Sequence, residues 1–133
     1  MFAADTPLSI LVADDEEDIR ALLLLWLQGF GHIVTTVESG KEATRLVQER
    51  QFHLIITDVV MPDGDGFELI SAFRKAQPSA RIVAMSGGGK YLESGDCLKI
   101  ARSLGAHAAV TKPFGMQQLQ VGIERALSNT AAA

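Results

Sequence analysis

Apolar residues along the chain alternate between two kinds of segment. Five short runs, rich in β-branched residues, have the length and composition of buried strands. They are Ser9–Ala13, Ile33–Val37, Leu54–Thr57, Arg81–Met85 and Ala108–Thr111. Five longer segments carry apolar residues three or four positions apart, which is the spacing of amphipathic helices. They are Glu16–Gln28, Gly40–Arg50, Gly66–Ala76, Ser94–Leu104 and Gly115–Leu127.

The order of these segments predicts the fold. Strands that are apolar almost throughout, each followed by a helix, are typical of a parallel sheet with helices on both faces. Right-handed crossovers then leave few topologies. We therefore predict a single α/β domain over residues 1–133, with a core of about 8–128. It is a doubly wound, five-stranded parallel sheet with five helices.

The first predicted helix has an unusually apolar surface. Its buried stripe is predicted to consist of Ile19, Leu22, Leu23, Trp26 and Leu27. Leu24 and Leu25 fall off that stripe, so they predict an apolar patch on the surface beside the end of the first strand. Deeper burial of the two leucines or a crystal contact would explain them equally well. A surface patch here would suit the docking of a helical partner.

Composition narrows the setting in which the protein works. Cys97 is the only cysteine, so no intramolecular disulfide can form, and a lone thiol suits a reducing cytosol. Residues 1–7 lack the pattern of a signal peptide, and the longest apolar run, Ala21–Leu27, is too short to span a bilayer. The net charge is −4 and the basic residues are scattered, so direct nucleic-acid binding is not expected. We expect a cytoplasmic protein without a membrane partner.

Polar side chains follow four of the five predicted strands. In an open parallel sheet, ligands bind outside the carboxyl ends of the strands. The residues at those ends are Asp14, Asp15 and Glu16 after the first strand, Asp58 after the third, Ser86 after the fourth and Lys112 after the fifth. The end of the second strand, near Glu38, adds nothing obvious.

This set of side chains suits phosphoryl transfer. Carboxylates brought within ~5 Å of one another repel by about 1 to 4 kcal/mol per pair, so they need a counter-ion. Carboxylate and carbonyl oxygens select Mg²⁺, which also binds phosphate oxygens. A central carboxylate is then a nucleophile, while the metal and Lys112 neutralise the transferring group.

Each residue taken alone has a structural explanation. The acidic run Asp15–Asp18 is typical of a helix N-cap and first turn. Asp58 can open a turn, Ser86 can begin a loop, and Lys112–Pro113 can be a strand exit. Their joint occurrence at the ends of successive strands favours the functional interpretation.

Four segments in order resemble the receiver domain of two-component response regulators, across Ser9 to Leu127. They are Ile10–Glu16 (ILVADDE), Leu54–Pro62 (LIITDVVMP) followed by Asp65-Gly66, Val83–Ser86 (VAMS) and Val110–Phe114 (VTKPF). The resemblance implies that Asp58 is the phosphoacceptor. It implies Mg²⁺ ligands in Asp14, Asp15, Asp58 and the backbone carbonyl of Val60, and phosphoryl-binding or switch groups in Ser86, Gly87 and Lys112. Pro113, after that lysine, is expected to follow a cis peptide bond.

The resemblance also implies the partners. A histidine kinase or a histidine phosphotransfer protein would donate the phosphoryl group, and phosphorylation would switch binding to a downstream protein target. Such a protein is a phosphoacceptor with intrinsic autodephosphorylation and not a turnover enzyme. We expect a monomer or weak dimer with no output domain after Leu127. A diffusible signalling module and a phosphorelay shuttle or sink both remain open.

Two departures from the family pattern bear on mechanism. Receivers usually carry Tyr or Phe three residues before the lysine, whereas Ala109 stands here and His107 is the nearest ring. The stretch from Ser86 to Lys112 is longer than typical and contains Gly87–Gly89. Val60 and Gly88, which would border the approach of a hydrolytic water, cannot orient it, so we predict slow autodephosphorylation.

Two alternative functions share the predicted fold class. Aspartyl-phosphate hydrolases place the nucleophile and a second aspartate two residues apart after the first strand, whereas Asp14 and Asp15 are adjacent and Glu16 follows. An FMN-binding, flavodoxin-like protein would carry a hydroxyl- and glycine-rich phosphate loop at that point. A Mg²⁺ titration compared with FMN absorbance separates these alternatives from a receiver.

Overall fold

The computed structural model describes residues 6–61, 64–86, 99, 102–103 and 105–128. Its centre is a five-stranded parallel sheet in the order β2-β1-β3-β6-β7. The strands are β1 (Ser9–Ala13), β2 (Ile33–Val37), β3 (Leu54–Asp58), β6 (Arg81–Ser86) and β7 (Ala108–Thr111). All five predicted strands are confirmed, and β3 and β6 each extend one residue further than predicted.

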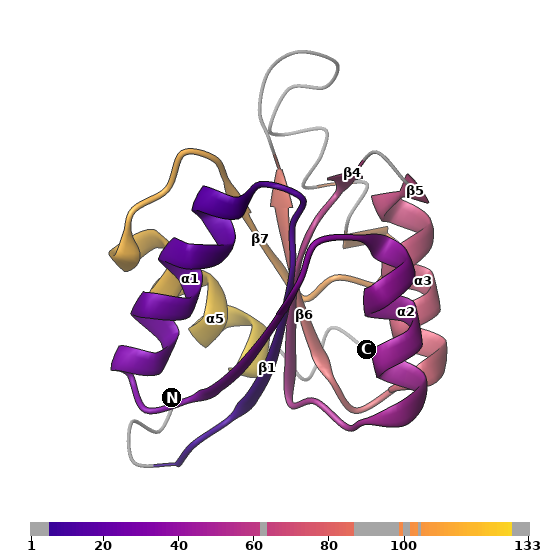
Figure 1. Ribbon diagram of the computed structural model, residues 1–133, viewed down its shortest axis with the longest axis horizontal. Coiled ribbons are helices and arrows are strands. Elements are labelled where there is room, and N and C mark those ends of the chain that lie inside the picture. The colour runs from indigo at the N-terminus through magenta and orange to yellow at the C-terminus, as the bar shows by residue number, and fades with distance from the viewer. Residues whose placement is uncertain (1–5, 62–63, 87–98, 100–101, 104, 129–133) are drawn as a thin grey trace.

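Helices cover both faces of the sheet. They are α1 (Glu17–Gly29), α2 (Gly40–Glu49), α3 (Gly66–Ala76) and α5 (Met116–Ser128). Helices α1 and α5 lie on one face, and α2 and α3 lie on the other (Figure 1). The structure thus describes four of the five predicted helices, and the fifth, predicted over residues 94–104, lies mostly outside the described residues. In the described part of the chain no helix has the length and apolar character needed to cross a bilayer.

Two hydrophobic cores form because side chains alternate along each strand. In β1, Ile10 and Val12 pack with Leu23 of α1 in one core, whereas Leu11 and Ala13 pack in the other. Leu23 is fully buried, as are all four of these strand residues. Because helices bury both faces of the sheet, polar side chains of a functional site can gather only at the ends of the strands.

The apolar surface of α1 differs in part from the prediction. Leu23 and Leu27 are fully buried, but Leu22, predicted for the same stripe, is 36% exposed. The buried stripe is centred on residues spaced four apart, and Leu22 lies about a quarter turn to one side of it. Leu25 is 69% exposed, as predicted for a residue off the stripe, and Leu24 is half-buried. The exposed pair on α1 is therefore Leu22 and Leu25.

The amino-terminal edge of the sheet carries the three histidines of the chain. His32, His53 and His107 each precede a strand and accept a backbone N–H at Nδ1. The donors are Leu8, Ser9 and Ile82, at 3.0, 2.9 and 3.0 Å. A ring nitrogen that accepts a hydrogen bond carries no proton, so this edge is built with unprotonated Nδ1 atoms.

A short antiparallel pair, β4 (Val60–Met61) and β5 (Gly64–Asp65), follows β3. Strands of two residues are too short to give a periodic signal, and the sequence did not predict them. The pair places the backbone of Val60 two residues beyond Asp58, at the carboxyl edge of the sheet.

Candidate functional site

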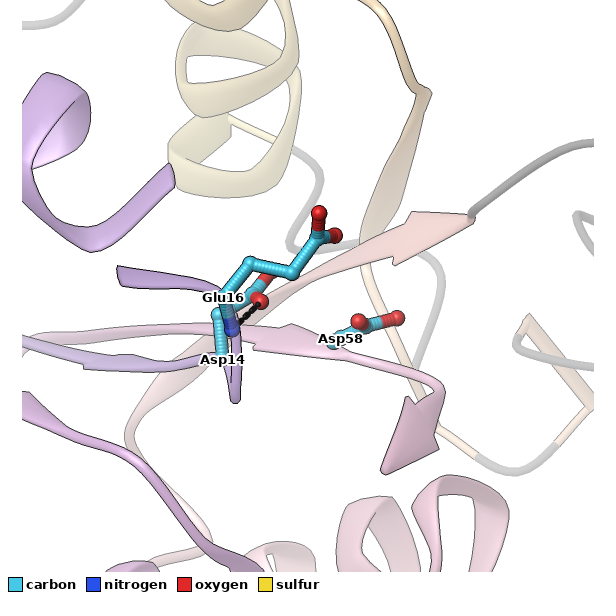
Figure 2. A group of neighbouring side chains, drawn as sticks. All are labelled: Asp14, Glu16 and Asp58. Atoms are coloured by element: carbon cyan, nitrogen blue, oxygen red, sulfur yellow. Dashed lines mark hydrogen bonds between the residues drawn. The ribbon is translucent and has the colours of Figure 1, made fainter. Parts of the chain in front are cut away.

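Three carboxylates meet at the carboxyl edge of the sheet. Asp14 follows β1 directly, Glu16 precedes α1, and Asp58 is the last residue of β3. Strands β1 and β3 are parallel neighbours with Ala13 opposite Thr57, so the residues that follow come side by side. One oxygen from each of the three carboxylates lies within 4.8 Å of the others (Figure 2).

Lys112 brings a cation to this group from another strand. It follows β7, and its Nζ lies 2.7 Å from Asp14 Oδ2, 3.1 Å from Asp58 Oδ2 and 3.1 Å from Glu16 Oε1. Its side chain is only 11% exposed. Burial by itself lowers the pKa of Lys112, but Asp14, Asp58 and Glu16 outweigh it and raise the pKa above its ordinary value. The ammonium therefore stays protonated.

Asp14 is held in place by the start of α1. Its Oδ1 accepts the Glu16 N–H at 2.8 Å, and its backbone oxygen accepts a hydrogen bond from Arg20 at 2.8 Å. Arg20 also pairs with Glu38 at 3.8 Å. Glu16, the N-cap residue of α1, makes no side-chain capping bond, so the capping role weighed for the acidic run does not account for Glu16.

The donor set fits a hard dication. Three carboxylates and one ammonium leave a formal charge of −2 when all are ionised (three negative, one positive). Asp14 Oδ2 is fully buried and, apart from the charge of Lys112, has no hydrogen-bond partner. A buried oxygen of this kind is costly unless a cation or donor satisfies it. Carboxylate oxygens are the type of ligand that Mg²⁺ prefers, and the negative charge of this group matches a dication.

The structure brings together Asp14, Asp58 and Lys112 of the predicted site residues. Asp15 is exposed, and the group of three neighbouring carboxylates contains Glu16 instead. The sequence placed Glu16 at the strand end but gave it no role. The signal that could have found it is its position between the strand end and the first helical residue, from which a long side chain can return to the site.

Strand β6 ends at Ser86. The backbone of Ser86 closes that strand opposite Thr111, one residue before Lys112, so the chain passes beside the site. The Ser86 side chain, Gly87 and Gly88 are outside the described part of the structure.

The residues after and within β7 also have defined places. The Lys112–Pro113 peptide bond is cis, as predicted. Ala109 is half-buried in β7 and lines a cavity of about 590 Å³ next to α5. His107 is buried at the opposite end of β7 from Lys112, where it bonds Ile82. His107 therefore does not stand in for an aromatic ring beside the site.

The family described as "Response regulator receiver domain" matches residues 10–124. The chain belongs to the response regulator receiver domain family. The receiver sequence is 41% identical over 126 residues to the "DNA-binding transcriptional regulator NtrC" of Azospirillum brasilense, covering 94% of this chain and 25% of that protein. It thus spans about a quarter of that relative.

Other receivers match over nearly their full length. The "Response regulator receiver protein CpdR" of Brucella abortus is 32% identical over 120 residues, which is 89% of this chain and 95% of that protein. The chemotaxis response regulator CheY4 of Vibrio cholerae superposes with a TM-score of 0.80 at 29% identity, covering 91% of this chain and 99% of that one. These matches favour neither the FMN-binding nor the hydrolase alternative.

Proposed function

We propose that this receiver takes a phosphoryl group from a phosphohistidine onto Asp58, in a Mg²⁺-dependent reaction. The observation that carries the proposal is the setting of Asp58. Its side chain is 6% exposed, its Oδ2 lies 3.1 Å from Lys112 Nζ, and its group includes two further carboxylates. A buried carboxylate beside a fixed cation can act as a nucleophile, because the cation is already in place to neutralise the negative charge of the phosphorylated product.

The transfer forms one bond and breaks another. An Asp58 carboxylate oxygen attacks phosphorus, the P–N bond to the donor imidazole breaks, and the imidazole leaves with the bond's electron pair and takes up a proton. Lys112 neutralises charge on the phosphoryl oxygens. Asp14, Asp58, Asp15 and the Val60 carbonyl are the proposed holders of Mg²⁺, with Ser86 and Gly87 as proposed phosphoryl contacts. Bound Mg²⁺ supplies charge neutralisation at the attacking and transferring oxygens.

The proposed donor is a histidine kinase or a histidine phosphotransfer protein. Helix α1 begins immediately after Glu16, and Leu22 and Leu25 are exposed along it. An apolar surface there suits docking of a helical phosphodonor, which would bring its histidine to Asp58. Phosphorylation would then alter the surface offered to a downstream protein, and hydrolysis of the acyl phosphate would end the signal without turnover of an external substrate.

The proposal is tested by the intact mass of the protein after incubation with acetyl phosphate and Mg²⁺. The mass should rise by one phosphoryl group, and Asp58→Asn should prevent the rise because an amide cannot form an acyl phosphate. Asp18→Asn, an exposed change in the first turn of α1, is the matched control and should label normally. Equal labelling of Asp58→Asn would place the acceptor elsewhere.

A further inference from the structure

Glu16 is the one carboxylate of the group for which the proposed reaction gives no role. Its side chain is 59% exposed, yet Oε1 accepts a hydrogen bond from Lys112 Nζ at 3.1 Å. The other two carboxylates in contact with Lys112, Asp14 and Asp58, are 0% and 6% exposed. The lysine is thus shared between two buried partners and one partner in contact with solvent.

When Asp58 is phosphorylated, the phosphoryl oxygens compete with the carboxylates for the N–H donors of Lys112. The new group carries about −1.5 to −2 charges and three acceptor oxygens. An ammonium has three N–H donors, and in this structure Lys112 has three carboxylate neighbours. Phosphorylation removes the carboxylate charge of Asp58 and so weakens one of these contacts itself. For Lys112 to offer the phosphoryl group a second N–H, the contact with Asp14 or with Glu16 must weaken too.

Glu16 is the contact that is released at the lowest cost. Asp14 Oδ2 is buried and its partner in the described part of the chain is Lys112, so losing Lys112 would leave a buried charge uncompensated. Water can replace Lys112 at the exposed Glu16 carboxylate, and exposed ion pairs contribute little to stability. The contact with Glu16 is therefore broken more readily than the contact with Asp14.

We propose that Glu16 is a releasable partner of Lys112, a positioning residue that holds the ammonium in the resting site and competes with the phosphoryl group for it. The inference rests on the proposed function of Asp58 and Lys112. It has two consequences of opposite sign. Removing the Glu16 charge weakens Mg²⁺ binding, because the acidic group loses one of its negative charges, and strengthens binding of a phosphoryl group, because Lys112 is free to meet it.

Three variants separate the contact from the charge. Glu16→Gln removes the charge and leaves only a weaker, neutral acceptor for Lys112. Glu16→Asp keeps the charge but is one methylene shorter, so the 3.1 Å contact is lost. Glu17→Gln removes one exposed charge a single residue further along, outside the carboxylate group, and is the matched control.

The experiment measures two affinities by isothermal titration calorimetry. The first is for Mg²⁺ alone, and the second is for beryllofluoride, a phosphoryl mimic, at saturating Mg²⁺. For Glu16→Gln we expect Mg²⁺ binding weakened and beryllofluoride binding strengthened, each by roughly three- to tenfold. Glu16→Asp should keep its Mg²⁺ affinity and still bind beryllofluoride more tightly, and Glu17→Gln should match the unaltered protein in both.

Beryllofluoride binding to Glu16→Gln that equals or falls below that of the unaltered protein would overturn the inference. So would a Glu17→Gln variant that behaves like Glu16→Gln, since charge in general would then be responsible. Failure of the proposed function gives a different result. In that case Glu16→Gln still binds the mimic more tightly, but the unaltered protein is not phosphorylated on Asp58 by acetyl phosphate.

Discussion

Lys112 donates a hydrogen bond from Nζ to Asp58 Oδ2 at 3.1 Å, although 54 residues separate the two in the chain. Strand β6 lies between β3, which ends at Asp58, and β7, which ends just before Lys112. The long lysine side chain crosses the end of that strand to reach the carboxylate. A cation and the proposed nucleophile are thus held by parallel strands that end at the same edge of the sheet.

The first prediction concerns Mg²⁺ and stability. Because a dication relieves repulsion among Asp14, Glu16 and Asp58, Mg²⁺ should raise the melting temperature. At one hundred times its dissociation constant it should add about 2.7 kcal/mol to the free energy of unfolding. Asp14→Asn and Asp15→Asn should each largely abolish the effect. A melting temperature indifferent to millimolar Mg²⁺ would contradict the proposed metal site.

The second prediction concerns the ion pairs of Lys112. Without Mg²⁺, Lys112→Ala should lower the free energy of unfolding by about 3 kcal/mol, because the buried carboxylates of Asp14 and Asp58 lose their cation. Saturating Mg²⁺ should restore part of the loss. Urea unfolding with and without Mg²⁺ measures both, with the exposed Lys75→Ala as the control. The same loss at both Mg²⁺ levels would show that the metal does not act on these carboxylates.

The third prediction is a loss of stability in acid that arises at the amino-terminal edge. Burial and the neighbouring charges of Arg81 and Arg74 lower the pKa of His107 to about 4, from an ordinary value of 6.5. Between these pH values the unfolded chain binds a proton at His107 that the folded protein excludes. The contribution of His107 to the free energy of unfolding is therefore complete above pH 6.5 and is lost as pH falls toward 4. The loss is on the order of 3 kcal/mol.

The His107 contribution is measured by urea unfolding across this pH range. Burial lowers the pKa of His32 too, so His32 adds to the loss in the same direction. His107→Gln keeps an acceptor for the Ile82 N–H but does not titrate, so its stability should depend less steeply on pH. If the free energy of unfolding of that variant depended on pH as steeply as that of the unaltered protein, His107 would not be the cause of the loss.

The fourth prediction concerns the lifetime of the phosphorylated state. Val60 offers no hydrogen-bonding side chain and Gly88 has no side chain, so neither can place a water in line with the phosphorus. Autodephosphorylation should therefore be slow, which favours a lasting signal or onward transfer. The decay of phosphoprotein in Mg²⁺ buffer tests this beside a double variant, Val60→Asn with Gly88→Glu. Decay of the parent as fast as the variant would contradict the role given to these positions.

Much of the fold could be predicted because strands buried on both faces leave a strong signal. Every residue of Leu54–Asp58 is buried, and the predicted run ended within one residue of the strand. Leu22 was wrongly assigned to the buried stripe of α1 because leucines surround it, and composition alone does not show which side of an apolar helix meets the sheet.

The sequence was sufficient to predict those site residues whose positions are set by the ends of strands. Asp14, Asp58 and Lys112 come together because each ends a parallel strand or follows one. The contact of Glu16 with Lys112 could not be predicted, since it depends on the direction in which the chain leaves β1 and on the reach of a flexible side chain. The family resemblance implied Asp15 as a metal ligand, and its side chain is exposed.

The most direct test of the central claim identifies the residue that carries the phosphoryl group. Protein phosphorylated with acetyl phosphate and Mg²⁺ is reduced with borohydride, which converts a phosphorylated aspartate to homoserine, and is then digested and sequenced by mass spectrometry. We predict homoserine at position 58, absent when Mg²⁺ is chelated and absent from Asp58→Asn. Homoserine at Asp14 or Asp15, or at no position in a protein that gained the phosphoryl mass, would contradict Asp58 as the acceptor.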